Sequence, residues 1–217
     1  MTRQSLHAAA RFRKYAPGNS HAAFYAIDTL LRNQSNQLLC ARKMNQPIIE
    51  TERLVLKSFV LADGPELQKL AGNPNVSKTT LNIPYPYEDG MAEAWISTHS
   101  ENWVNKRSAT FAIKLKSSHE LIGDVSLVDI QESQAELGYW VGEPYWDRGY
   151  CTEAAKALVH YSMNKMGIKK IVAEHLRTNP ASGRVMEKIG MNHVCSTEKT
   201  DRDGNQAVVE VYEITST

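Results

Sequence analysis

The segment from Glu136 to Leu176 constrains the fold most, because a strand, a helix and a second strand follow one another in it. Glu136–Val141 and Lys170–Leu176 are short runs of apolar and aromatic residues, as is typical of strands. Between them, Thr152–Met166 carries apolar residues at helical spacing and ends at Gly167. A strand–helix–strand unit favours a sheet that helices cover.

The remaining periodicity adds hairpins and three more helices. Alternating apolar residues predict strands at 53–59, 111–115, 121–130, 194–197 and 208–214, and the last two turn through Asp203-Gly204. Helices are expected at 63–72, at 91–103 and at 180–189. Hairpins combined with a strand–helix–strand unit predict an α+β (mixed α/β) fold with a central mixed sheet flanked by helices.

Charge divides the chain near residue 43. The first 43 residues hold seven basic side chains and one acid, a net charge of +6, so the remainder carries −5 of the total of +1. We therefore expect a basic, poorly ordered N-terminal extension at 1–43 and one domain at 44–217. The extension is open to two interpretations, an upstream start codon with Met44 as the natural initiator, or a transit peptide.

Composition argues against several classes of partner. A net charge of +1 gives no reason to expect nucleic acid or a membrane, and no apolar run approaches the roughly 18 residues of a membrane span. The three cysteines (Cys40, Cys151 and Cys195) are widely spaced and show no metal-ligand pattern. We expect no metal and a reducing, cytoplasmic location.

The turn before the central helix has the chemistry of an anion site. Trp146–Cys151 follows a strand and leads into a helix whose first amides have no internal partner. Gly149 allows close approach of a ligand to the backbone, and Arg148 adds a cation at the mouth. A plain strand–helix turn that happens to contain glycine is the alternative interpretation.

This segment resembles the GNAT acetyltransferases, whose acetyl-CoA loop follows Arg/Gln-x-x-Gly-x-Gly/Ala. Gly149 matches the central glycine, whereas Trp146 and Cys151 replace the first and last positions. Within the superfamily it is similar to the ribosomal-protein-alanine N-acetyltransferase branch, through Gly138-Tyr-Trp140, Tyr145-Trp146 and Gly149-Tyr-Cys-Thr-Glu-Ala154. Glu52-Arg-Leu54, Asn179-Pro-Ala-Ser182 and Glu187-Lys-Ile-Gly190 extend the resemblance over about Ile49 to Ile214.

The resemblance implies a single GNAT-like domain with a splayed sheet and a site for acetyl-CoA. The pantetheine arm is expected to meet the backbone of Trp140 and Val141 between the strands 136–141 and 170–176. The amides of Arg148, Gly149, Tyr150, Cys151 and Thr152 are expected to hold the diphosphate, and Asn179 to bond the arm.

The catalytic groups are less evident from the sequence. Many relatives use a tyrosine to protonate the leaving thiolate, and it falls at Met186, which cannot donate a proton. Ser182 is the expected substitute, unless it only fills a helix turn. Glu136 is the candidate base for the amine, directly or through water, unless it is a paired structural carboxylate or bulk water takes the proton.

The expected function is acetyl transfer from acetyl-CoA to a primary amine, in the first place the α-amine of a protein or peptide. A small amine such as an antibiotic, a polyamine or an amino-acid derivative is the second possibility, and a non-catalytic CoA-binding module is the third. A monomer or a homodimer is equally compatible with the sequence.

Overall fold

The computed structural model describes residues 45–201 and 204–216. The chain separates into two units, and Gln46–Thr217 is the unit that carries the fold. The predicted extension at 1–43 lies outside the described residues, and so does Asp203 of the predicted final turn.

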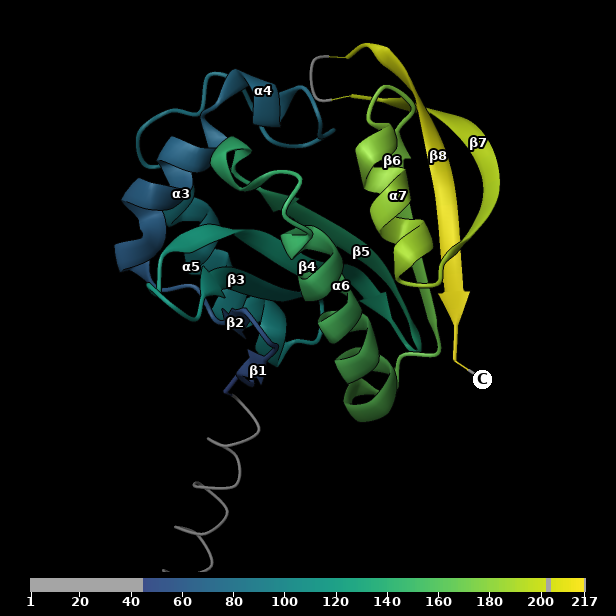
Figure 1. Cartoon of the computed structure of the whole chain (residues 1–217), viewed down its shortest axis with the longest axis horizontal. Coiled ribbons are helices and arrows are strands. Elements are labelled where there is room, and N and C mark those ends of the chain that lie inside the picture. The colour runs from purple at the N-terminus through teal and green to yellow at the C-terminus, as the bar shows by residue number, and fades with distance from the viewer. Residues whose placement is uncertain (1–44, 202–203, 217) are drawn as a thin grey trace, which may run out of the picture. The chain divides into compact units, whose positions relative to one another are not determined.

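Eight strands form one sheet in the described part of the chain (Figure 1). Its order is β1-β2-β3-β4-β5-β6-β8-β7, and its pairs are antiparallel except for β5–β6, which is parallel. The predicted mixed sheet is thereby confirmed. The strands are β1 (Ile49–Glu50), β2 (Leu54–Lys57), β3 (Ala109–Leu115), β4 (Leu121–Gln131), β5 (Gln134–Val141), β6 (Lys170–Leu176), β7 (Asn192–Thr200) and β8 (Gln206–Thr215).

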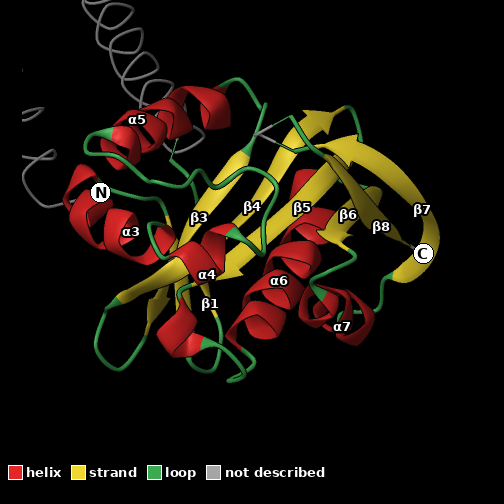
Figure 2. Cartoon of the chain, turned by 90° about the horizontal axis from the view of Figure 1, so that it is seen from above, coloured by secondary structure: helices red, strands yellow, loops and turns green. Residues whose placement is uncertain are grey.

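Helices cover both faces of this sheet, as Figure 2 shows. One face carries α3 and α5, and the opposite face carries α6 and α7. The main core, with Phe111, Leu158 and Ile171 fully buried, lies under α6. A smaller core with Leu67 and Ile96 lies under α3 and α5. The helices are α3 (Gly64–Ala71), α4 (Pro74–Ser77), α5 (Met91–Val104), α6 (Tyr150–Tyr161) and α7 (Pro180–Lys188).

The sheet opens between β5 and β6. The two strands pair only from Gln134↔Lys170 to Leu137↔Ala173. Beyond Leu137, β5 continues to Val141 in register with β4 alone. The splayed sheet is therefore present, and the open edge of β5 faces the diverging end of β6.

Several boundaries differ from those the periodicity predicts. α6 begins at Tyr150, two residues before the predicted Thr152, because Gly149 at φ +76° forms its N-cap and reverses the chain there. Its last turn, Ser162–Met166, is a π-helix that ends at Gly167. β1 and α4 were not predicted, since each spans at most one turn or two residues.

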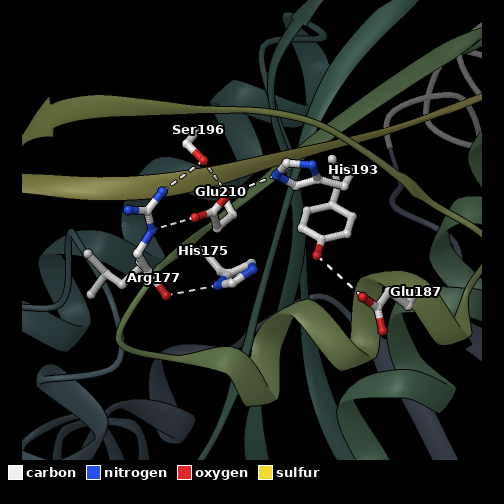
Figure 3. Close-up of polar contacts among 8 residues, drawn as sticks. His175, Arg177, Glu187, His193, Ser196 and Glu210 are labelled. Atoms are coloured by element: carbon white, nitrogen blue, oxygen red, sulfur yellow. Dashed lines mark hydrogen bonds and ion pairs between the residues drawn. The ribbon is translucent and has the colours of Figure 1, made fainter.

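The C-terminal hairpin β7–β8 is attached to β6 by a polar cluster (Figure 3). Arg177 Nε donates to Glu210 at 2.6 Å, and the hydroxyl of Ser196 donates to the same carboxylate at 2.7 Å. His193 Nε2 lies 2.8 Å from Glu210 Oε2, the same oxygen that accepts from Ser196, whereas Arg177 bonds Oε1. Hydrogen bonds from Ser196, Arg177 and His193 lower the pKa of Glu210 to about 2. The cluster holds the hairpin beside the strand that forms one wall of the opening.

Candidate active site

A cavity of about 920 Å³ occupies the opening between β5 and β6. Its walls come from β4, β5 and β6, from the loop at 79–84, and from the first turns of α6 and α7. A cavity of this size at a split in a sheet is large enough for a drug-sized ligand. The site is therefore built where the main chain of β5 lacks a strand partner.

The first turn of α6 presents its amides to this cavity. Gly149, Tyr150, Cys151 and Thr152 all line it, and the first intrahelical bond runs from Glu153 N to Gly149 O at 3.0 Å. The amides before Glu153 consequently have no acceptor inside the helix. Together with the helix dipole they form a site for an anionic group. The side chain of Arg148 is the nearby cation that the sequence predicted, although Arg148 itself is not part of the lining.

Arg53 fixes the loop that leads into α6, a role that sequence reasoning missed. Its Nε donates to Glu153 at 2.7 Å and its Nη1 donates to the carbonyl of Arg148 at 2.9 Å. Its guanidinium lies 4.7 Å from the ring centre of Tyr150. Thr51 and the Arg53 amide also donate to Glu153. Burial alone raises the pKa of Glu153, but these hydrogen bonds outweigh burial and lower it.

Arg53→Ala should therefore weaken acetyl-CoA binding indirectly, through the loop that Arg53 holds in place. The loop loses two charge-assisted hydrogen bonds, so we expect the dissociation constant to rise by roughly 10-fold or more. Calorimetric titration measures this. Arg107→Ala is the control, because among the described residues the Arg107 side chain has one ion pair, a long one of 3.9 Å with Glu101, far along the chain from the loop. Equal affinities in the two variants would limit Arg53 to a surface role.

The open edge of β5 offers main-chain groups on alternate residues. Gly142 N donates to Ile122 O at 2.8 Å, and Trp140 is paired with Asp124 in β4. In such a ladder the backbone of Trp140 faces β4, whereas Tyr139 and Val141 face the opening. The Val141 carbonyl already accepts from Trp146 Nε1 at 2.8 Å. Of the two residues expected to meet the pantetheine arm, Val141 has its amide on the open side, and Trp140 lines the cavity from the neighbouring position.

The start of α7 brings Asn179 and Ser182 to the opposite wall. Asn179 is the N-cap, and its Oδ1 accepts from the Ser182 amide at 3.4 Å. Its Nδ2 donates to the carbonyl of Thr79 at 3.0 Å, which ties the loop at 79–84 to α7. Both residues line the cavity. Met186, which stands where many relatives have a tyrosine, is 1% exposed and belongs to the core.

Tyr139 is a functional candidate that the sequence did not single out. Its hydroxyl lies 2.9 Å from Ser182 Oγ and donates to the Ser182 carbonyl at 2.8 Å. Burial raises the pKa of the Tyr139 hydroxyl, so it stays protonated. The signal in the sequence was its position in β5, since Leu137, Tyr139 and Val141 alternate onto one face of the strand. Two hydroxyls that share a hydrogen bond thus stand together on the α7 side of the opening.

Glu136 lies at the point where β5 and β6 begin to separate. It is half-buried, lines the cavity and is paired with Val128 in β4 and Val172 in β6. Burial raises the pKa of Glu136, Glu174 and Asp129 raise it further, and Lys199 opposes them. Lys199 forms its own ion pair with Glu174 at 2.5 Å. The structure shows no arginine bonded to Glu136 among the described residues.

Asp124 is a second carboxylate in the cavity wall that sequence reasoning missed. It is 4% exposed, and its neighbours along β4 are apolar or small. The pKa of Asp124 is raised to about 8, because the effect of burial exceeds the opposite effect of the hydrogen bond from Ser126. An acid in the middle of a predicted apolar strand was the available signal.

The wall opposite α7 is aromatic. Tyr87, Met91 and Trp95 line the cavity from the loop before α5 and from α5 itself. His99 packs against Trp95 at 4.2 Å between ring centres and against Phe59, and burial lowers its pKa to about 4.

No group of His, Cys, Asp or Glu among the described residues could hold a metal ion. Within the same residues, no helix is long and apolar enough to cross a membrane.

Comparison with known proteins agrees with this geometry. Residues 53–192 match the acetyltransferase (GNAT) domain family. The chain is 30% identical over 166 residues to the uncharacterized N-acetyltransferase YnaD of Bacillus subtilis, covering 76% of this chain and 94% of YnaD.

Two solved structures share the fold. RimL, the ribosomal L7/L12 alpha-N-protein acetyltransferase solved with coenzyme A, superposes with a TM-score of 0.71 at 17% identity over 78% of this chain and 98% of RimL. The microcin C7 self-immunity acetyltransferase MccE, solved with acetyl-CoA and AMP, gives 0.70 at 20% identity over 76% of this chain and 94% of MccE.

The family match covers more than half of the chain, in the part that forms the splayed sheet and the start of α6. YnaD and its Bacillus subtilis relative YoaA, which match over 94% and 82% of their length, are both named N-acetyltransferases. The protein therefore belongs to the GNAT family and is an acetyl-CoA-dependent acyltransferase.

Proposed function

We propose that the protein transfers the acetyl group of acetyl-CoA to a primary amine, the α-amine of a protein or peptide, by direct attack in a ternary complex. The observation that carries the proposal is the continuity between the open edge of β5 and the free amides of the first turn of α6. One cavity joins them, so a single extended thioester can use both.

The cavity that joins β5 to α6 also indicates which residues bind acetyl-CoA. The amides from Arg148 to Thr152 hold the diphosphate at the positive end of the helix dipole. The pantetheine arm lies along β5 as an added strand, meeting Val141 and the face that Trp140 shapes. Asn179 contacts the arm from α7, in addition to its capping role. Arg53 keeps the diphosphate loop in place.

The reaction needs one proton removed and one supplied. The amine nitrogen attacks the thioester carbon and forms the amide, while the bond from that carbon to sulfur breaks. Glu136, directly or through water, accepts the proton that the nitrogen loses. Ser182 gives a proton to the departing thiolate and regains it through Tyr139, whose hydroxyl lies 2.9 Å away. The free main-chain amide of Val141 polarises the thioester carbonyl.

RimL, an alpha-N-protein acetyltransferase of ribosomal L7/L12, supports the protein acceptor, and so do the branch motifs around Gly138 and Gly149. MccE favours the second candidate, a small-molecule amine, because its structure holds a nucleotide beside acetyl-CoA. Incubation with labelled acetyl-CoA and panels of peptides and small amines, read by mass spectrometry, separates the two. Label on peptide N-termini supports the proposal, label on small amines alone selects the second candidate, and no label on any amine refutes both.

Glu136→Gln should remove the lower limb of the pH–rate profile. Ionised Glu136 is the active form, so the wild-type rate rises with pH through the pKa of this group. Burial places that pKa above the ordinary value of about 4.3 for a glutamate. The variant keeps the shape of the side chain but has no titrating group, and its kcat should be lower by roughly 100- to 10,000-fold.

The measurement is kcat/KM against pH for the wild type and the variant. Glu132→Gln is the matched control, because Glu132 is exposed in the β4–β5 turn and loses the same charge. Superimposable profiles for the wild type and Glu136→Gln would show that bulk water takes the proton and that Glu136 is a structural carboxylate.

A further inference from the structure

Asp124 is a buried carboxylate that the roles above do not use. It lies in the middle of β4, paired with Ala112 in β3 and Trp140 in β5, and it is 4% exposed. Its Oδ2 accepts a hydrogen bond from Ser126 Oγ at 3.3 Å. Its Oδ1 is buried and has no hydrogen-bond partner among the described residues. Both Asp124 and Ser126 line the cavity.

A buried carboxyl oxygen without a hydrogen-bond partner is costly, so Asp124 calls for a partner from outside the chain. Lys114 lies two residues along β3 from Ala112, but its ammonium group is bound to Asp63. No lysine or arginine among the described residues bonds Asp124. The partner it lacks is a donor of N–H hydrogen bonds that carries positive charge.

The two faces of the sheet separate Asp124 from the groups that serve the leaving thiol. Directly paired residues point to the same face, so Asp124, Trp140 and Ala112 share the face of α3 and α5. Tyr139 alternates onto the other face, where it contacts Ser182 of α7. Asp124 nevertheless lines the same cavity as Cys151 in the first turn of α6, so both faces of the sheet contribute to one site.

We infer that Asp124 and Ser126 form the binding point for the primary amine of the acceptor, with the Asp124 carboxylate accepting its N–H hydrogen bonds. The inference rests on the proposed acetyl transfer and names the residues that hold its second substrate. The amine enters from the aromatic wall of Tyr87 and Trp95, on the face of α3 and α5. It meets the thioester from the face opposite Ser182, so that nucleophile and leaving group lie on different sides of the carbonyl. The raised pKa of Asp124 agrees with a carboxylate that is stabilised when an ammonium group arrives. Because an ammonium nitrogen has no lone pair, it first loses one proton to bulk water, and Glu136 takes the second proton when the amide forms.

The acceptor class follows from this pocket. A primary ammonium group fits, because a compact head with several N–H donors can reach a carboxylate that is almost fully buried. The same geometry disfavours hydroxyl acceptors, which bring no charge to compensate Asp124.

Asp124→Asn tests the inference, because it keeps the shape of the side chain and removes the charge. With an amine that the wild type acetylates, kcat/KM should fall by roughly 100-fold or more, while the dissociation constant for acetyl-CoA stays within about two-fold of the wild type. Glu132→Gln again serves as the control for loss of one charge. A deamino analogue, with methyl in place of the amine, should inhibit the wild type and Asp124→Asn equally.

The outcomes separate the inference from the proposed function. Wild-type kcat/KM in Asp124→Asn overturns the inference alone, whereas a wild type that acetylates no amine overturns the proposed function and the inference with it. The melting temperature of Asp124→Asn should not fall, since burial already favours the neutral form of Asp124 and asparagine keeps its shape without a charge. If Asp124→Asn does not fold, Ser126→Ala provides the second variant, and we expect it to lower kcat/KM by about 10-fold through the lost orientation of the carboxylate. Wild-type kinetics in Ser126→Ala would then overturn the inference.

Discussion

Gly149→Val is expected to weaken acetyl-CoA binding by about 100-fold or more, through two effects that act together. Gly149 has φ +76°, a region that a β-branched residue avoids, so the N-cap of α6 must change its backbone. A Cβ at this position lies 3.6 Å from Arg53 Nη2, and Gly149 lines the cavity where we propose that the diphosphate binds, so the larger side chain takes space there. Calorimetric titration of the folded variant with acetyl-CoA measures the loss.

Gly167 supplies a matched control at the other end of the same helical segment. It has the same φ of +76°, and an added Cβ meets nothing within 4 Å. Gly167→Val therefore carries a similar backbone strain, of about 1–2 kcal/mol in folding stability, but leaves the cavity unchanged. Both variants should melt earlier than the wild type, and only Gly149→Val should lose acetyl-CoA. Normal affinity in Gly149→Val would move the diphosphate site away from α6.

Ser182→Ala should lower kcat by roughly 10- to 10,000-fold with little change in acetyl-CoA affinity, the range expected for a lost proton donor. The reason is the position of its hydroxyl, 2.9 Å from that of Tyr139 on the wall of the cavity. Steady-state kinetics and a parallel binding titration separate kcat from affinity. Ser97→Ala is the control, because Ser97 only bonds the Ala94 carbonyl on the exposed side of α5.

Tyr139→Phe refines the same test. If Ser182 donates the proton and Tyr139 returns it, Tyr139→Phe should show a smaller loss than Ser182→Ala. A larger loss in Tyr139→Phe would make the tyrosine the donor and Ser182 its partner. Full turnover in Ser182→Ala would restore the interpretation that the serine only occupies the first turn of α7.

The sequence predicts best which residues lie together when they are close along the chain. Gly149 and the residues after it form one turn, Asn179 and Ser182 form another, and both turns line the cavity, while the roles of these residues stay predictions. The succession of most strands and helices along the chain followed from periodicity, whereas the order of the strands within the sheet did not. The start of α6 was misplaced by two residues because the helix begins at a left-handed glycine, which the apolar pattern does not mark.

The residues that were missed depend on contacts between distant segments. Arg53 reaches Arg148 across 95 positions, and Tyr139 reaches Ser182 across 43. Asp124 sits within a run of apolar residues, and its burial becomes visible only when β3 and β5 flank it. Register between strands, which no single segment specifies, decides which of these side chains enter the cavity.

The short pairing between β5 and β6 also affects the stability of the protein and therefore its lifetime. Four residue pairs join the two halves of the sheet along this seam, and a bound pantetheine arm would supply the missing main-chain partners beyond Leu137. A ligand that completes a sheet binds the native chain and not the unfolded one, so occupancy adds to the folding free energy by mass action, about 2.7 kcal/mol when its concentration is 100 times the dissociation constant. The cellular amount of such an enzyme would then depend on the concentration of its acyl donor. Ligand-free molecules would unfold locally between β5 and β6 more often, and proteases would degrade them first.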